Sequence, residues 1–468
     1  MRNLRSRVEI LSEDEIRLIH KAALRILSGT GFHMPHAECL RRCEKAGARV
    51  DHQASVVRIP AGRMEELLRI LRPEPPEDPD RTPRLAGGIS TQVFVTDYLT
   101  KTRRYGTMDD NLRGIALVDH LKNIPGCNAA TVPHDVDSRI SDLASYHLLL
   151  TYSAKAGGTY VINPVSAPYI LDMGEAMGRK EFYLFETISP LRFRPETCEM
   201  GLLFADRGHH LGIAPMLVGG TSAPATMAGA LTLVTAEVLA SLFAVYALTG
   251  RAEGWYGHGS HFSDPRTMLC SFGSPVQAMY AVASAQIGRF YGFYAGSNSA
   301  LSDSLLPDFQ CGFEKTLSAV MGALAGTVSI GCQGIAGADQ GFSFEQLVLD
   351  NEWLDAYNFV VAGFEVDEER LATELIEAVG IGGNFIAEDH TADHVFESWW
   401  PSSLFGRDSF DAWQALGAPG SLERAHGKVL EYTRDYRKRE PVIPASRAQD
   451  LDRILEAAKR AILGTGTP

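Results

Sequence analysis

The sequence predicts a single large α/β enzyme, a (β/α)₈ barrel with an N-terminal extension of helices and β-hairpins. Its 468 residues are 45% hydrophobic and 22% charged, which is globular composition with ample material for a large core. Short apolar segments, each followed by a helical pattern, recur seven times along the middle of the chain. A doubly wound open sheet would not normally repeat this unit so often, so the barrel is favoured.

The first part of the chain reads as helices and hairpins. Residues 12–28 predict an amphipathic helix with Ser12 as N-cap and Glu15 completing a capping box. Further helices are predicted at 36–46 and 60–71, separated by a hairpin at 48–60. A proline-rich connection (72–83) leads to a second hairpin (91–106) and a helix from 107, with Asp109 and Asp110 in its first turn.

The barrel strands are then expected in order along the chain. We expect the domain boundaries at 1–120 for the N-terminal extension, 121–400 for the barrel and 401–468 for a C-terminal helical segment. The eighth strand is expected from the glycine-rich stretch 380–387 or nearby. The first seven strands are predicted at 126–132, 158–163, 182–188, 213–218, 254–258, 292–297 and 327–332.

Composition excludes several classes of function. The net charge of −13 and the lack of a Lys/Arg run argue against nucleic-acid binding. The most apolar stretch, 227–248, includes Glu237 and three Ser or Thr residues, which favours a buried helix over a membrane span. The seven cysteines never form a Cys-x-x-Cys pair. Together with an N-terminus unlike a signal peptide, this predicts a cytoplasmic protein.

Candidate binding groups lie at the expected strand ends. The run 219–226 is expected to open a long helix, and Thr221 and Ser222 there could bind a carboxylate or phosphate, although an ordinary capped turn explains them equally. Several aromatic side chains could surround an alkylated ammonium, but alternation along a strand forbids Trp255 and Tyr256 from both pointing inward. The other strand-end candidates are Tyr160, Phe185, His258 and Tyr294 among the rings, and His134, Asn163, Glu186, Asn298, Asp303 and Gln333 among the polar groups.

Metal and nucleotide sites have little support. Neither His258 with His261 nor the pair His209 and His210 places two imidazoles on one face of a strand. Cys39 and Cys43, one helical turn apart, are expected in the core. Neither a dinucleotide glycine motif nor a phosphate-loop lysine motif occurs. We therefore predict no bound metal, and a metal-dependent barrel hydrolase is the weakest alternative.

Several long segments resemble the trimethylamine methyltransferase family, which demethylates methylated amines with a corrinoid. They run through most of the chain, from Leu11 to Tyr436. The family fold is a (β/α)₈ barrel. The segments are LSEDEIRLIHKAALRILSGTGF (11–32), AGARVD with VRIP (46–60), GGTSAPATMAGALTLVTAEVLA (219–240), DFQCGFEKTLSAVMGALAG (308–326), SFEQLVLDNEW (343–353), EAVGIGGNFIAEDHT (377–391) and DAWQALGA (411–418).

The resemblance also suggests a branch and a reaction. Members that use trimethylamine carry a pyrrolysine, which we place in the loop after the sixth strand, where this chain reads Ser299-Ala300-Leu301-Ser302-Asp303. Because none is present, the chain resembles the non-pyrrolysine branch, whose substrates are quaternary amines such as glycine betaine. The implied reaction moves a methyl group to the Co(I) of a corrinoid (cobalamin) carried by a cognate partner protein. No tightly bound cofactor is expected.

For the substrate site we predict a set of aromatic and neutral polar residues, with the catalytic residues unassigned. Substrates such as proline betaine or carnitine, and a non-catalytic binding protein of the same fold, remain alternatives. We also expect a homo-oligomer. The predicted substrate-binding residues are Tyr98, Thr221, Ser222, Trp255, Tyr256, His258, Asn298 and Gln333.

Overall fold

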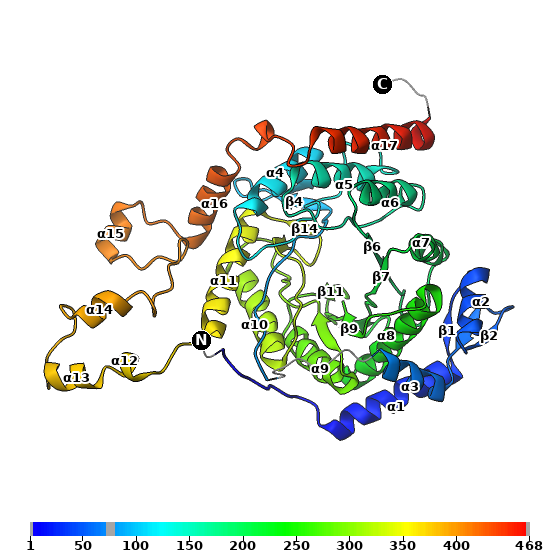
Figure 1. Cartoon of the computed structure of the whole chain (residues 1–468), viewed down its shortest axis with the longest axis horizontal. Helices are drawn as coiled ribbons and strands as arrows, with labels where there is room; N and C mark the ends of the chain where they lie inside the picture. The colour runs from blue at the N-terminus through cyan, green and yellow to red at the C-terminus, as the bar shows by residue number, and fades with distance from the viewer. Residues whose placement is uncertain (1–2, 72–79, 465–468) are drawn as a thin grey trace.

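A computed structural model describes residues 3–71 and 80–464 of the chain. Helices surround a set of short strands, the N-terminal helices cover one edge, and α17 (Ala445–Leu463) covers the opposite edge (Figure 1). A segment after α11 (Phe344–Ala362) projects away from this body before the chain returns in α16 (Ser421–Tyr432) (Figure 1). The fold is a mixed α/β arrangement.

The N-terminal elements form as the sequence predicts. Helix α1 (Glu13–Gly29) begins with the capping box of Ser12 and Glu15. The hairpin of β2 (Arg49–Asp51) and β3 (Val56–Arg58) pairs in antiparallel register, and β1 (Phe32–His33) joins it to give the order β1-β3-β2. The neighbouring helices are α2 (Ala37–Lys45) and α3 (Ala61–Ile70). Residues 72–79 of the predicted proline-rich connection lie outside the described residues.

The second hairpin and the helix after it are also confirmed. Strands β4 (Phe94–Thr96) and β5 (Arg103–Tyr105) pair in antiparallel register. Helix α4 (Met108–Asp119) has Thr107 as N-cap, with Asp109 and Asp110 in its first turn. Asp110 accepts a hydrogen bond from the Thr107 backbone N–H at 2.9 Å and so completes a second capping box.

The remaining body elements alternate between helices and short strands. The helices are α5 (Ser141–Tyr152), α6 (Ala167–Ala176), α7 (Pro195–Asp206), α8 (Met227–Thr249), α9 (Val276–Tyr291) and α10 (Phe309–Ala325), with the 3₁₀ turn η1 (Tyr436–Lys438). The strands are β6 (Phe182–Phe185), β7 (His210–Ile213), β8 (Val218–Gly219), β9 (Trp255–His258), β10 (His261–Ser263), β11 (Cys270–Ser271), β12 (Tyr294–Ser297), β13 (Ile335–Ala336) and β14 (Gly341–Phe342).

Five small sheets form among the described residues, and none of them closes into a barrel. Parallel pairs join β6 with β7, β8 with β10, β9 with β12 and β4 with β14. Single parallel bridges extend this pattern between Gly88 and Gly126, Cys127 and Ala156, Ile188 and Met216, and Gly296 and Ser329. The predicted α/β class is therefore confirmed at this coarser level.

Some of the predicted strands are present in the structure and others are not. Those at 182–188, 254–258 and 292–297 contain β6, β9 and β12, whereas the one at 213–218 starts earlier, as β7. The segments 126–132 and 327–332 hold only single bridges, and 158–163 contains no strand. The predicted strand at 380–387 is wrong, because this stretch is irregular and Ile381 and Ile386 are exposed.

Helix α8 lies in the centre of the larger hydrophobic core. It is the one described helix that is long and apolar enough to cross a membrane, yet 83% of its most apolar window is buried within the protein. Its Glu237 is fully buried, accepts hydrogen bonds from the Ser189 hydroxyl at 2.7 Å and the Leu191 N–H at 2.8 Å, and thereby fixes the loop after β6. Burial raises the pKa of this carboxyl group.

Candidate active site

Strand β9 presents two of the predicted substrate residues to the surrounding helices. Tyr256 is fully buried, and its hydroxyl lies 2.8 Å from the Thr235 hydroxyl on α8. His258 is also buried and its Nε2 lies 2.7 Å from the Ser284 hydroxyl on α9. Burial lowers the pKa of His258 to about 4, so the ring is neutral near pH 7. Both side chains belong to the packing between strand and helix.

Trp255 lies on the other face of β9, which we call the central face because it points away from the helices. An added Cβ atom on Gly257 would lie 2.1 Å from the Trp255 Nε1, and one on Gly296 would lie 2.5 Å from the same indole. The two glycines therefore leave the room in which the indole lies across β9 and β12. The Trp255 side chain is partly buried and packs against the edge of the larger hydrophobic core.

A tyrosine and a carboxyl group meet on the same side of the neighbouring strands. The Tyr160 hydroxyl donates a hydrogen bond to Glu186 Oε1 at 2.8 Å. Glu186 follows β6 on the face of Phe182, whose ring lies over Gly212 of β7. Burial is the largest cause of the raised pKa of Glu186, and burial followed by the Glu186 charge raises that of Tyr160.

The central face is open. Tyr160 is 46% exposed, Met216 41% and Tyr294 45%, although all three belong to segments that run inside the ring of helices. Side chains on the opposite face of the same segments are buried, as Tyr183 and Phe185 are in β6. A packed interior would bury both faces, so this exposure indicates space in front of the strand ends.

An amide and an imidazole group meet where β12 ends and β10 begins. Asn298 Nδ2 lies 3.2 Å from His261 Nε2, and burial lowers the pKa of His261 to about 3. The neutral imidazole therefore accepts a hydrogen bond from the amide, which fixes its orientation.

Polar oxygens without partners gather at the same strand ends. Gln333 is fully buried; its Nε2 donates to the Gly331 carbonyl at 2.7 Å, whereas its Oε1 has no partner within the described chain. Ser297 at the end of β12, Ser299 after it, and Thr96 at the end of β4 have buried hydroxyls without a partner among the described residues. Leaving such a group unpaired costs about 1–3 kcal/mol, so these atoms call for water or ligand.

A buried ion pair supports the two loops that carry these polar groups. Lys315 on α10 and Asp350 on α11 are both fully buried, with Nζ and Oδ2 3.0 Å apart. Lys315 also donates to the Ala300 carbonyl at 3.1 Å, and Asp350 accepts from the Gly334 N–H at 2.7 Å. Ala300 and Gly334 have φ angles of 63° and 78°, so the pair secures two left-handed turns next to Asn298 and Gln333. The sequence pattern of α10 and α11 gave no signal of this contact.

The predicted site at Thr221 and Ser222 does not stand at a helix terminus. Helix α8 begins at Met227, and its N-cap is Thr226, which accepts from the Gly229 N–H at 3.2 Å. Ser222 accepts a hydrogen bond from the Val218 N–H, and Thr221 donates to the Val218 carbonyl, so both close a turn. The run 219–226 precedes a long helix, as expected, and Thr221 and Ser222 form the ordinary turn that was the alternative to a binding site.

Tyr98 lies apart from the central face, in the turn of the β4–β5 hairpin. Its ring stacks on His426 of α16, with 4.1 Å between the centroids, and the Lys101 Nζ lies 5.6 Å from its centre. It lines a cavity of about 150 Å³ together with Thr96, Lys101 and Glu345. The ring contacts of Tyr98 are thus with His426 and Lys101 rather than with Trp255 or Asn298.

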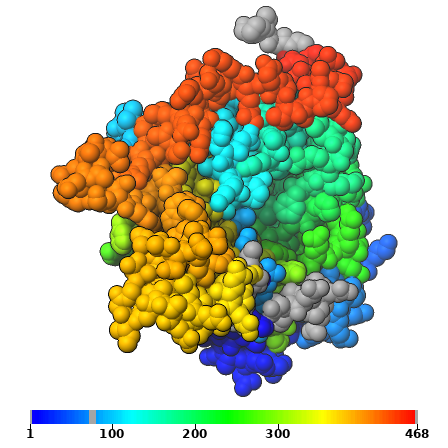
Figure 2. All heavy atoms as spheres, turned by 60° about the vertical axis from the view of Figure 1, so that its left-hand side comes forward, coloured from blue at the N-terminus to red at the C-terminus, as the bar shows by residue number. Residues whose placement is uncertain are grey.

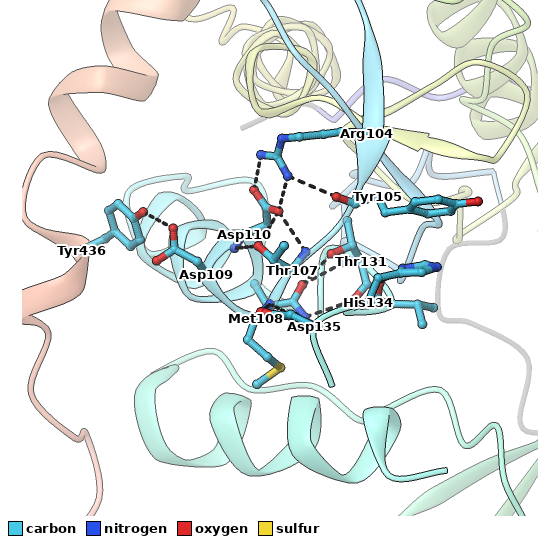
Figure 3. Close-up of polar contacts among 12 residues, drawn as sticks. Arg104, Tyr105, Thr107, Met108, Asp109, Asp110, Thr131, His134, Asp135 and Tyr436 are labelled. Atoms are coloured by element: carbon cyan, nitrogen blue, oxygen red, sulfur yellow. Dashed lines mark hydrogen bonds and ion pairs between the residues drawn. The ribbon is translucent and has the colours of Figure 1, made fainter. Parts of the chain in front are cut away.

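The rim beside this hairpin carries a second aromatic stack. The Tyr105 ring stacks with that of His134, with 4.0 Å between the centroids, and with that of Phe94, with 5.1 Å between the centroids. Arg104 and Asp110 hold the base of the hairpin through two hydrogen bonds of 2.7 Å (Figure 3). His134 was a strand-end candidate, and the structure places it in this exposed stack rather than against Trp255.

The strand-end side chains on the central face include aromatic rings, a carboxyl group and an amide. Trp255 and Tyr160 offer ring faces, Glu186 offers one carboxyl group, and Asn298 offers an amide. Within the described residues, no three His, Cys, Asp or Glu side chains gather as metal ligands. Glu186 and Tyr160 were among the sequence candidates but outside the predicted substrate set, and their shared contact is what marks them in the structure.

Comparisons with known proteins place the chain in the family that its sequence segments resemble. The trimethylamine methyltransferase (MTTB) family model matches residues 1–462. The trimethylamine methyltransferase MttB1 of Methanosarcina mazei is 28% identical, over 98% of this chain and 96% of that protein. The glycine betaine methyltransferase of Desulfitobacterium hafniense is 26% identical, over 98% of both chains. The predicted resemblance is confirmed, and with it the methyltransferase class: the chain belongs to the trimethylamine methyltransferase family.

Proposed function

We propose that this protein transfers a methyl group from a quaternary amine of the glycine betaine type to the Co(I) of a corrinoid carried by a partner protein. Family membership over nearly the whole chain supports methyl transfer, and a relative that covers the chain from end to end is named a glycine betaine methyltransferase. The proposal rests on the partly exposed aromatic side chains of Trp255 and Tyr160 and on the carboxyl group of Glu186, which accepts a hydrogen bond from Tyr160.

The site suits a permanently charged ammonium group. Aromatic ring faces attract such a cation by about 0.5–2 kcal/mol each, depending on how dry the site is. Glu186 adds a negative charge when it is ionised, and the amides of Asn298 and Gln333 can meet the polar end of the substrate. In this assignment Tyr256 and His258 support the strand from behind.

The reaction requires the enzyme mainly to position the methyl group and to exclude water from the site. A quaternary nitrogen already carries its positive charge, so it leaves as a neutral tertiary amine when its methyl carbon is attacked. The C–N electron pair stays on nitrogen, and the corrinoid Co(I) supplies the pair for the new bond, giving methyl-Co(III). No proton moves in this step. Rate then depends on holding methyl and cobalt in line.

We further propose that the short sheets are parts of one eight-stranded barrel. Seven of the strand segments would lie at or near the predicted strands, and 88–96 would take the place predicted for 380–387. The seven segments are 126–132, 156–162, 182–188, 210–218, 255–261, 294–299 and 329–333. Support comes from the parallel bridges of this segment at Gly88 and Gln92 and from the hydrogen bond between the Gln333 N–H and the Gly88 carbonyl at 2.7 Å. A cytoplasmic location belongs to the same proposal, because corrinoid Co(I) requires a reducing compartment.

The test is a spectroscopic assay with purified components. The chain is mixed with a corrinoid reduced to Co(I), free or bound to a corrinoid protein, and with a panel of glycine betaine, proline betaine, carnitine and trimethylamine. We expect conversion of the Co(I) spectrum to that of methyl-Co(III) with at least one quaternary amine and not with trimethylamine. Calorimetric binding of a quaternary amine without any demethylation would instead favour a non-catalytic binding protein.

A further inference from the structure

Residues 363–420 form a segment, here called the arm, that leaves the body after α11 and returns at α16. Four short helices make up most of its regular structure: α12 (Glu368–Leu371), α13 (Thr373–Val379), α14 (Asp389–His394) and α15 (Phe410–Ala415). The arm stands clear of the helices around the strands (Figure 1), and its yellow and orange atoms form a separate lobe in the space-filling view (Figure 2).

The arm has almost no core of its own. None of its four helices contains a buried residue. Its attachment to the body runs through residues 400–404, where Leu404 is buried and Trp400 Nε1 donates to Asp355 at 3.1 Å. Helices shorter than about 12 residues are marginal in water unless an apolar face is packed against something. The arm therefore requires a covering surface.

The arm carries more exposed large apolar side chains than a surface that faces water usually has. Phe364 is 75% exposed, Ile386 85% and Phe396 69%, and Ile381 projects fully into solvent. Large apolar side chains exposed in such number within one segment are typical of a protein–protein contact. The other exposed large apolar residues between 363 and 420 are Val366, Leu371, Ile376, Phe385, Val395, Trp399, Phe405, Phe410 and Leu416.

Charge indicates what kind of surface covers the arm. Residues 363–420 include 12 acidic and 2 basic residues, which accounts for most of the chain's net charge of −13. One of the two basic residues, Arg370, is already paired with Asp367 and Glu397 of the arm itself. The covering surface must therefore be apolar and basic.

The body of the same chain offers such a surface on α1. Leu18, Lys21 and Arg25 are spaced to lie along one face of this helix, and all three are exposed, Leu18 by 68%. Neither Lys21 nor Arg25 has an acidic partner among residues 3–71 and 80–464. Helix α1 lies in a different part of the body from the arm (Figure 1), so a second molecule can present this face.

From these features we infer that the arm is a subunit contact that packs on a second copy of this chain, against the face of α1 that carries Leu18, Lys21 and Arg25. Its length exceeds the roughly 20–30 residues a side that a stable interface needs. A partner that leaves after each methyl transfer would expose the arm again in every cycle, whereas a second copy covers it permanently. That last step rests on the proposed function, but the contact itself can be tested without any enzymatic assay.

The experiment is sedimentation of the full chain with matched variants. Phe396→Asp changes an arm residue, and Leu269→Asp changes a residue of equal exposure, 69%, on the body. We expect the unmodified chain to sediment as a dimer or larger oligomer, and Phe396→Asp, alone or with Ile381→Asp, to weaken self-association by at least about tenfold. Leu269→Asp should leave it unchanged. A monomeric unmodified chain, or an oligomer that the arm variants do not weaken, would overturn the inference.

Two further measurements locate the contact. Lys21→Glu with Arg25→Glu should weaken self-association to a similar extent, and an unchanged oligomer would exclude the α1 face as the counterpart. Hydrogen exchange should show arm amides protected in the unmodified oligomer and unprotected in Phe396→Asp. Protection that arises only when a corrinoid protein is added would assign the arm to that partner instead. Because all the substituted residues are exposed, circular dichroism should show an unchanged fold.

Discussion

The two faces of the strands differ in a way that amino-acid composition does not reveal. On the face toward the helices, Tyr256 and His258 are buried and hydrogen-bonded to Thr235 and Ser284. On the central face, Tyr160 is 46% exposed and Trp255 is only partly buried. Aromatic and polar residues occur on both. What distinguishes a binding face from a core face is therefore unfilled space, rather than the type of side chain.

The largest expected effect concerns the support behind the central face. Lys315→Met would leave Asp350 buried without its charge partner, so we expect a loss of about 3–5 kcal/mol in the free energy of unfolding. Urea denaturation monitored by circular dichroism measures this. Lys428→Met is the matched control, because its surface contact with Glu431 has the same 3.0 Å separation and should contribute less than about 1 kcal/mol. Equal losses in the two variants would show that the buried pair does not hold the loops.

The second effect is a pH dependence that arises on the helix-facing side. Burial lowers the pKa of His258 from 6.5 to about 4 in the folded chain, so on acidification the unfolded chain takes up this proton first. Stability should therefore fall as the pH drops from about 6.5 to about 4, by about 3 kcal/mol from this group alone. His258→Gln should show a shallower decline in unfolding free energy over the same range. Identical pH profiles would mean that His258 is not held neutral by burial.

A third effect belongs to the central face. Because burial raises the pKa of Glu186, its carboxylate forms only above that raised value, and affinity for a quaternary amine should fall as the pH drops through it. Glu186→Gln should bind more weakly, by about 1 kcal/mol or more, and with little pH dependence. Calorimetric titration with glycine betaine at several pH values measures both changes. The exposed acid Glu253, changed to Gln, is the control, and a loss there of the same size would contradict a specific role for Glu186.

Sequence reasoning was most successful where the determinants are local. The capping box of Ser12 and Glu15, the first hairpin and the apolar strand at 254–258 depend on neighbouring residues, and all three are present. Strand alternation showed that Trp255 and Tyr256 must point to opposite sides, but it could not tell which side faced the helices. Only the contacts with α8 and α9, which come from distant residues, settle that question.

The errors have the same origin. The stretch 380–387 forms no strand, whereas Gly88 and Gln92, for which no barrel strand was predicted, form parallel bridges with Gly126 and Thr131. Long-range pairs such as Lys315 with Asp350, or Tyr160 with Glu186, leave no periodic signal in the sequence. The family resemblance correctly identified the methyltransferase class, because it compares whole segments rather than single motifs.

The most direct test of this account compares two neighbouring residues of β9 in the corrinoid assay. The rate of methyl-Co(III) formation from a quaternary amine is measured for Trp255→Ala and Tyr256→Phe under identical conditions. Losing a cation–ring contact of about 0.5–2 kcal/mol should lower kcat/KM of Trp255→Ala by between about twofold and thirtyfold. Tyr256→Phe should lose stability, by about 1 kcal/mol, but keep kcat/KM nearly unchanged. A variant pair with the reverse behaviour would contradict the assignment of the central face as the substrate site.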